Sequence, residues 1–230
     1  VKMYTAGQEI DVSGDGYNPL GSLTIDGKEV NLSEQPAIAR LLEIQALCND
    51  ARLDHVTEDG MDEWRIIGDP TEGAMIVAAA KAGIDREEIN KTQPRLQELP
   101  FDSQRKLMTT FHQTKNRELA AFTKGAPDIL VERCTQIVRS DGSVEPLTPE
   151  DTKAILDENK ALANQAYRVL AMAFRIVPEI PDHPSIETDE KDLVFCGLVG
   201  MIDPPRSEAR DAIKICKSAG IRAVMITGDY

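Results

Sequence analysis

Two short polar segments near the end of the sequence have residue types that suit phosphate chemistry. The segment 203–206 reads Asp-Pro-Pro-Arg and follows the apolar run 193–202, while 227–229 reads Thr-Gly-Asp and follows the run 221–226. If both runs are parallel strands, their carboxyl ends meet at one edge of a sheet, where ligands bind in doubly wound folds. Paired carboxylates at such an edge commonly hold Mg²⁺ against a phosphate. The two prolines would also present Arg206 in a fixed direction.

Lys124 ends an apolar run and stands directly before a predicted short helix that Pro127 opens. A helix N-terminus carries about half a positive charge, so a lysine there is unfavourable unless an anion lies nearby. The backbone N–H groups of the helix end and of Gly125 could bind that anion. A solvated lysine compensated by Asp128 explains the pattern equally well. On the residues alone, both interpretations stay open.

Phe101 is one of few aromatic side chains, since the sequence holds five Phe, four Tyr and one Trp. It follows Pro100 and precedes a polar turn that contains the cations Arg105 and Lys106. An aromatic ring at a loop mouth beside cations can stack on a purine and steer its phosphates. Taken alone, a ring that simply fills the loop is the more ordinary interpretation.

Two further charged residues each have a structural and a binding interpretation. Glu72 follows Asp-Pro-Thr at 69–71, a helix start in which it can reach back as in a capping box. Its carboxylate could equally accept a hydrogen bond from an adenine amino group. Arg168 opens an apolar run after a long helix, where an ion pair with Asp151 or Glu158 is the simpler interpretation. The planar guanidinium could instead meet a phosphate.

The sequence predicts no metal site made of cysteine or histidine. The four cysteines are separated by 86, 62 and 20 positions, and the three histidines are scattered. No pair therefore has the spacing of a zinc site. The segment 11–16 looks like the start of a calcium loop, but Pro19 and Ser22 occupy positions where a calcium loop places ligands.

Length and composition bound the remaining possibilities. The 230 residues are 41% apolar, which excludes a mostly disordered, collagen-like or coiled-coil chain. The net charge of −13 opposes binding to nucleic acid and to an anionic membrane face. No apolar run approaches the roughly 18–20 residues of a spanning helix. We therefore expect a globular α/β protein that neither binds nucleic acid nor inserts into a membrane.

The patterning of residues 1–200 predicts one mixed domain, a largely antiparallel sheet flanked by helices. Hairpins are expected around the turn 26–28 and across 106–123, and further strands at 64–67 and 169–177. Helices are expected over 33–47, 69–81, 128–134 and 148–167. The stretch 178–192 is rich in proline and acidic residues, so it is expected to be a surface loop.

The last forty residues have a different pattern. The run 193–202 suits a strand buried on both faces, 207–218 is an amphipathic helix followed by Gly220, and 221–226 is a second apolar run. Strand, helix and strand in so short a length predict a right-handed parallel unit. We expect a boundary near residues 200–203. Residues 1–200 would form the first domain, and 201–230 the incomplete start of a doubly wound one.

Six segments together resemble the P-type cation-transporting ATPases, in the group of calcium, sodium and proton pumps. They are residues 68–72 (Gly-Asp-Pro-Thr-Glu), 100–103 (Pro-Phe-Asp-Ser), 124–127 (Lys-Gly-Ala-Pro), 167–171 (Tyr-Arg-Val-Leu-Ala), 201–206 (Met-Ile-Asp-Pro-Pro-Arg) and 225–229 (Met-Ile-Thr-Gly-Asp). They occur in the family's order over 68–229, which is 162 of the 230 residues. Residues 16–21, Gly-Tyr-Asn-Pro-Leu-Gly, are also similar to the beginning of this region in the family.

The resemblance implies the nucleotide-binding domain of such a pump with the first portion of its phosphorylation domain. ATP and Mg²⁺ would be its cofactors. Phe101 would stack on adenine and Glu72 would contact the adenine amino group. The remaining contacts implied by the resemblance come from Ser103, Lys106, Lys124, Gly125 and Arg168. The phosphoryl-transfer site would include Asp203, Arg206, Thr227, Gly228 and Asp229.

One position departs from the family. Animal calcium pumps often carry an arginine two residues after the stacking phenylalanine, where this sequence has Ser103. Part of the expected phosphate contact is therefore missing at that position. Arg105, two residues further along, is a candidate to replace it.

The resemblance also implies partners that lie outside this sequence. The family's phosphorylated aspartate stands in an Asp-Lys-Thr-Gly-Thr segment, which does not occur here and would lie just before Val1. We expect an excised piece of a pump at the cytoplasmic face of a membrane, which works with the phosphorylation, actuator and membrane domains of the same chain. The piece is expected to bind ATP without hydrolysing it.

Three other functions are compatible with parts of the sequence. A soluble phosphohydrolase with a large cap would need its nucleophilic aspartate inside the chain, and no aspartate here has the right following residues. A non-catalytic nucleotide-binding module would bind in the same way without any membrane segment upstream. A heavy-metal pump would have a His-Pro pair in its nucleotide domain, but His183-Pro184 lies in the acidic loop. The transported ion cannot be read from these residues.

Overall fold

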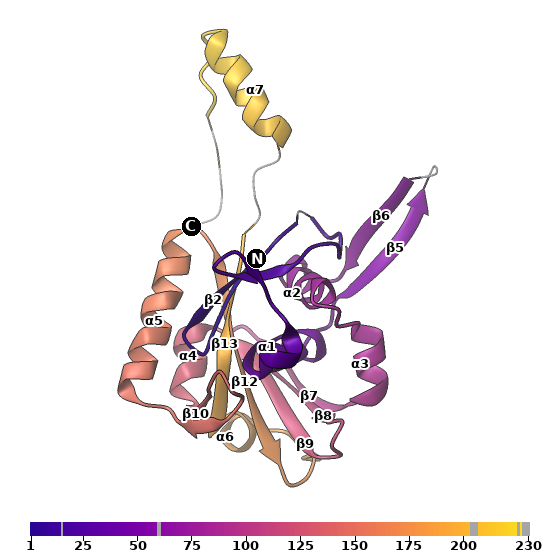
Figure 1. Cartoon of the computed structure of the whole chain (residues 1–230), viewed down its shortest axis with the longest axis vertical. Helices are drawn as coiled ribbons and strands as arrows, with labels where there is room; N and C mark the ends of the chain where they lie inside the picture. The colour runs from indigo at the N-terminus through magenta and orange to yellow at the C-terminus, as the bar shows by residue number, and fades with distance from the viewer. Residues whose placement is uncertain (15, 59–60, 203–206, 225, 227–230) are drawn as a thin grey trace.

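The computed structural model describes residues 1–14, 16–58, 61–202, 207–224 and 226. An eleven-stranded sheet forms its centre, with the strand order β4-β3-β2-β1-β13-β12-β9-β8-β7 (Figure 1). These strands are β1 (Lys2–Thr5), β2 (Gln8–Val12), β3 (Leu23–Ile25), β4 (Lys28–Glu29), β7 (Arg95–Asp102), β8 (Leu107–Gln113), β9 (Leu119–Gly125), β12 (Arg168–Val177) and β13 (Leu193–Met201). All pairs along this path are antiparallel, as the sequence predicts.

Two further strands extend the sheet and two others stand apart from it. β10 (Cys134–Val138) runs parallel to β13, and β11 (Val144–Pro146) pairs with β10. β5 (Arg52–Glu58) and β6 (Met61–Ile67) pair with each other as a separate hairpin, which projects from the body of the molecule in Figure 1. The sequence pattern indicates only the second half of β6, and no strand is predicted at β5, β7, β10 or β11.

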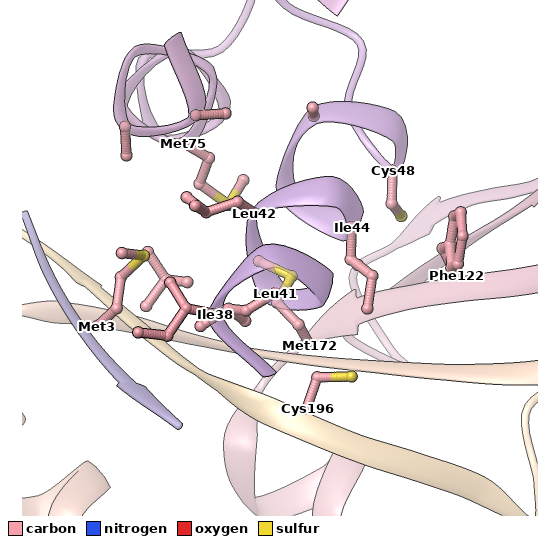
Figure 2. Close-up of a cluster of buried hydrophobic side chains, with 14 of the residues drawn as sticks. Met3, Ile38, Leu41, Leu42, Ile44, Cys48, Met75, Phe122, Met172 and Cys196 are labelled. Carbon is pink, nitrogen blue, oxygen red and sulfur yellow. The ribbon is translucent and has the colours of Figure 1, made fainter. Parts of the chain in front are cut away.

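Helices cover both faces of the sheet because its strands alternate large apolar side chains between the faces. Met172 of β12 packs in one core with Ile38 and Leu41 of α1 (Pro36–Leu47) and Met75 of α2 (Pro70–Lys81), as Figure 2 shows. The neighbours of Met172, Ala171 and Ala173, lie in a second core. That core also contains residues of α4 (Pro127–Glu132) and α5 (Pro149–Asn164).

The boundaries of α2 and α5 follow from local capping, as the sequence predicts. Asp69 caps α2 by accepting hydrogen bonds from the backbone N–H groups of Thr71 and Glu72. Thr148 caps α5 in a complete capping box with Asp151. The predicted helix over 33–47 is divided into a short 3-10 helix, η1 (Leu32–Glu34), and α1. A further helix, α3 (Arg86–Thr92), was not predicted.

The acidic stretch 178–192 is not the exposed loop that the sequence predicts. It contains a short helix, α6 (Ile186–Asp189), and two of its acidic residues, Asp189 and Glu190, are buried. Ser185 caps this helix. Composition alone marks the stretch as solvated, but Glu190 has partners for its charge inside the molecule, described below.

The predicted parallel unit at the end of the sequence is corrected by the structure. β13 lies in the first sheet between β1 and β12, and residues 221–224 and 226 form no strand. The apolar run in β13 is explained by helices on both faces of that sheet. α7 (Ser207–Ser218) forms as predicted, and its side chains from Ala209 onward are exposed except for half-buried Cys216. The boundary near residues 200–203 stays a prediction.

In the described ranges, no helix is long and apolar enough to cross a membrane.

Candidate functional site

The strand register brings most of the predicted binding residues to one end of the sheet. Gly125, the last residue of β9, pairs with Leu107 at the start of β8 and with Ala171 near the start of β12. Leu107 in turn pairs with Asp102 at the end of β7. Six predicted binding residues therefore lie at this end of the sheet. They are Phe101, Ser103 and Lys106 in and beside the turn between β7 and β8, with Lys124, Gly125 and Arg168.

Glu72 joins this end of the sheet from α2, because its side chain forms an ion pair with Lys124. The Glu72 Oε1 and Lys124 Nζ atoms are hydrogen-bonded, and only 15% and 6% of the two side chains are exposed. The other carboxylate oxygen, Oε2, accepts hydrogen bonds from the backbone N–H groups of Asp50 (2.9 Å) and Ala51 (3.1 Å). Oε2 of Glu72 thus binds the chain that enters β5, while Oε1 has one partner among the described residues, Lys124.

This pairing settles two questions that the sequence left open. The anion near Lys124 is the carboxylate of Glu72, and Asp128 lies exposed in α4. The capping-box role proposed for Glu72 is wrong, because its carboxylate points to Lys124 and to the residues before β5. Asp69 alone supplies the cap of α2. The N-terminus of α2 therefore lies against the end of β9.

Arg168 lies on the same side of the site as the cap of α2. It is exposed at the start of β12, where it pairs with Met201 at the end of β13. Burial of Asp69 raises its pKa, but hydrogen bonds from Glu72 and Thr71, together with the charge of Arg168, leave that pKa below its usual value. Asp151, one of the two partners that the sequence suggests for Arg168, binds Arg139. The cation is therefore presented to solvent near an ionised carboxylate.

Phe101 is 63% exposed, the largest exposed fraction of any phenylalanine in the described chain. It lies near the end of β7, two strands from Lys124 in the sheet order. The interpretation that Phe101 fills its own loop is wrong, because a ring with that function would be covered by the loop residues. An exposed ring at the edge of a charged site can stack on a ligand.

Gly125 has a structural reason to be glycine. A Cβ atom at this position would lie 2.3 Å from the carbonyl oxygen of Lys106 and 2.5 Å from Leu107 Cδ2. The backbone of Lys106, which has φ +54°, also accepts a hydrogen bond from the N–H of Ala126 at 3.1 Å. The close approach of β9 to this turn fixes Lys106 beside the end of β9. Whether Gly125 also lines a ligand pocket stays a prediction.

Arg105 does not replace the cation that Ser103 lacks. Its guanidinium binds the carboxylate of Glu190 through Nε at 3.0 and 3.1 Å, and donates through Nη2 to the carbonyls of Leu99 (3.2 Å) and Pro100 (2.6 Å). Ser103 itself is exposed in the same turn. No local pattern distinguishes Glu190, which is one of several acidic residues in a stretch that resembles a solvated loop.

The residues predicted for phosphoryl transfer lie outside the described residues. They are Asp203, Arg206, Thr227, Gly228 and Asp229. Across the part of the chain that the structure covers, no three or more His, Cys, Asp or Glu side chains are grouped as a metal site. The described residues therefore include neither the predicted phosphoryl-transfer residues nor a group of side chains that could hold Mg²⁺.

Two grooves in the described structure lie elsewhere. One, of about 730 Å³, runs between the β5–β6 hairpin and the helices α2 and α3, with Trp64 and Arg86 among its lining residues. The other, of about 690 Å³, lies between α1 and α3. Neither is lined by a predicted binding residue. The candidate site is instead an open surface at the end of the sheet, with an exposed ring and cations around a buried ion pair.

The fold and this surface define a class of α/β domain, in which one end of a largely antiparallel sheet presents charged residues and an aromatic ring. A family model described as P-type ATPase, cytoplasmic domain N, matches residues 37–208. The chain belongs to the P-type ATPase family and contains its cytoplasmic domain N.

Curated relatives agree with this assignment over nearly the whole chain. The chain is 42% identical to a calcium-transporting ATPase of Bacillus subtilis over 231 aligned residues, which cover 99% of the chain and 25% of that protein. It is 43% identical to calcium-transporting ATPase 1 of Bacillus cereus, with 95% and 22% covered. It is 38% identical to the cation-transporting ATPase pma1 of Synechocystis, with 99% and 25% covered. The chain thus spans about a quarter of the length of these relatives.

Proposed function

We propose that the chain is the ATP-binding domain of a cation pump. The observation that carries this proposal is the exposed Phe101 at the same sheet end as the buried Glu72–Lys124 pair and the cations Lys106 and Arg168. Adenine would stack on Phe101 and meet Glu72 and Lys124. The phosphates would extend toward Arg168 and the residues that follow β13.

The residues present fit a nucleoside triphosphate by their chemistry. An exposed ring binds any base by stacking, and exposed cations attract the phosphate tail. Few cations surround the site, so we expect modest affinity, with a Kd of about 0.1–1 mM, or roughly −4 to −5.5 kcal/mol.

The parent pump would use this domain to deliver ATP to an aspartate elsewhere in its chain. That aspartate would attack the γ-phosphate, and the resulting acyl phosphate would drive cation movement. Bound Mg²⁺ would supply charge neutralisation at the transferring phosphate. Within the described residues, the task of the chain is to bind and orient the nucleotide. Because the Asp-Lys-Thr-Gly-Thr segment is absent from the sequence, we propose that the chain alone does not hydrolyse ATP.

A titration with MgATP followed by backbone NMR tests the binding proposal. The amide signals of Phe101, Glu72 and Lys124 should shift together with one Kd in the stated range. Signals of the exposed face of α5, such as that of Lys153, serve as an internal control and should stay in place. If millimolar ATP leaves the three site signals unmoved, this chain does not bind ATP at the proposed surface.

A further inference from the structure

One buried carboxylate, that of Glu190, binds the turn that follows Phe101. Glu190 is completely buried, and its carboxylate accepts hydrogen bonds from Arg105 Nε (3.0 and 3.1 Å) and from Thr109 Oγ1 (2.8 Å). Its backbone carbonyl accepts a further bond from Arg133 Nη1 at 3.0 Å. A carboxylate without solvent needs such partners to remain charged.

Arg105 links Glu190 to the residues on the N-terminal side of Phe101 by hydrogen bonds. While its Nε binds Glu190, its Nη2 donates to the carbonyl oxygens of Leu99 and Pro100. The guanidinium is a rigid planar fork, so these directions are fixed relative to each other. The carbonyl of Pro100 is part of the peptide bond between Pro100 and Phe101. The backbone before the ring is therefore held at a set position.

The residues after Phe101 are held from the other side by Asp102. Its carboxylate accepts hydrogen bonds from the backbone N–H groups of Gln104 (2.9 Å) and Arg105 (3.0 Å), and these bonds, from Arg105 first and then Gln104, lower its pKa. Its carbonyl accepts the N–H of Lys106 at 2.6 Å. The turn is thus closed on itself while the Phe101 side chain is 63% exposed. A fixed backbone with a free ring is suited to present that ring to a ligand.

We infer that Arg105 and Glu190 are positioning residues, which hold the Phe101 ring in the orientation required to stack on the base of the nucleotide. This inference rests on the proposed function, because it assigns the two residues a role in ATP affinity. It also explains why Arg105, a cation next to the site, faces into the protein. Rigid support of a contact residue raises affinity because less conformational freedom is lost on binding.

The test measures Kd for MgATP by NMR titration in the wild type and in the single variants Glu190→Gln, Arg105→Lys and Phe101→Ala. It then measures Kd in the two double variants that combine Phe101→Ala with Glu190→Gln or with Arg105→Lys. Gln cannot balance the charge of Arg105, and Lys keeps the charge but loses the fork that reaches Leu99 and Pro100. Glu43→Gln is a matched control, because it breaks the partly buried Arg40–Glu43 pair on α1, away from the turn.

We expect Glu190→Gln or Arg105→Lys to raise Kd at least about threefold, and to have no further effect once Phe101 is alanine. Glu43→Gln should leave Kd unchanged even if it lowers stability. If Glu190→Gln does not fold, Arg105→Lys alone tests the inference. This variant keeps a cation beside the buried Glu190 carboxylate.

Two results would overturn the inference, and they differ from a failure of the proposed function. If folded variants bind ATP like the wild type, the Arg105–Glu190 pair only stabilises the fold, and ATP binding stands. If the loss is equally large with and without Phe101, the pair does not act through the ring. If the wild type itself does not bind ATP, the proposed function fails and this inference fails with it.

Discussion

Glu72 and Lys124 lie 52 positions apart in the sequence and form a nearly buried ion pair that joins the first turn of α2 to the end of β9. The pair brings two separate sequence motifs, at 68–72 and 124–127, into one site. Because Glu72 also accepts the N–H groups of Asp50 and Ala51, three segments of the chain meet at this carboxylate. The residues that we propose to bind the nucleotide therefore also hold these segments together.

Lys124→Met should therefore lower stability. Removing one partner leaves an unbalanced buried carboxylate, which costs about 3–5 kcal/mol in a fully buried pair, and somewhat less here because 15% of Glu72 is exposed. The free energy of unfolding from urea denaturation measures the loss. Glu63→Gln, which breaks the exposed Arg65–Glu63 pair, is the control and should change stability by less than about 1 kcal/mol. Equal effects of the two substitutions would refute a special role for the buried pair.

Phe101→Ala should separate binding from stability. The ring is mostly exposed, so its removal should change the free energy of unfolding by less than about 1 kcal/mol. Affinity for ATP should fall by about 1–3 kcal/mol, the usual range for loss of base stacking on an aromatic ring. Leu96→Ala, which removes another exposed apolar side chain on β7, is the control and should leave Kd unchanged. Unaltered affinity in Phe101→Ala would remove this ring from the site.

Gly125→Ala should destabilise the chain through the backbone of Lys106. The added Cβ would lie 2.3 Å from that carbonyl oxygen, so β9 and the turn before β8 would have to separate. We expect a loss of about 1–3 kcal/mol, as for other overpacked positions, measured by thermal or urea unfolding. At Gly200 the added Cβ meets only the Tyr167 side chain, at 3.2 Å, so Gly200→Ala should cost less. The reverse order of the two losses would contradict this account.

Stability should fall as the pH drops below neutrality because of His112. Burial is the main cause that lowers the pKa of His112, from 6.5 to about 4, and its ring nitrogens contact Gln93 O and Thr110 Oγ1. The unfolded chain binds a proton at this residue near pH 6.5 while the folded chain does not, so acid favours unfolding. From about pH 7.5 to about pH 5.5 this effect amounts to about 1 kcal/mol.

Comparison of two histidine variants checks this pH dependence. Between pH 7.5 and pH 5.5, the unfolding free energy of His112→Gln should fall by about 1 kcal/mol less than that of the wild type. This difference does not depend on the stability of the variant at neutral pH. Substitution of the exposed His183 by Gln controls for general effects of removing a histidine. A pH profile of His112→Gln parallel to that of the wild type would show that His112 is not the titrating group.

The isolated chain should bind ATP without turnover. A malachite-green assay for phosphate release, at millimolar MgATP, should give the rate of the buffer blank. Phe101→Ala serves as the control for contaminating enzymes, since phosphate release that persists in this variant would not come from the proposed site. Release above the blank that is lost in Phe101→Ala would contradict the proposed inactivity, because the hydrolysis would then depend on the proposed site.

Local signals in the sequence were sufficient for many of the elements. Asp69 and Thr148 cap helices where predicted, and the hairpin between β8 and β9 forms across its polar turn. These features depend on hydrogen bonds and hydrophobic periodicity within a few residues, which the sequence contains directly. Six short motifs in a fixed order also sufficed to identify the family, which the comparisons confirm.

Contacts between distant segments were decided only by the tertiary structure. The sequence did not reveal that Glu72 pairs with Lys124 or that Arg105 turns inward to Glu190. It also predicted a parallel unit of β13 with a strand at 221–226, whereas β13 pairs antiparallel with β1 and β12. Each of these depends on strand order and register, which bring together residues that share no local signal. A charged side chain is read as solvated until a partner from elsewhere is placed beside it, because only that partner offsets the free-energy cost of burial.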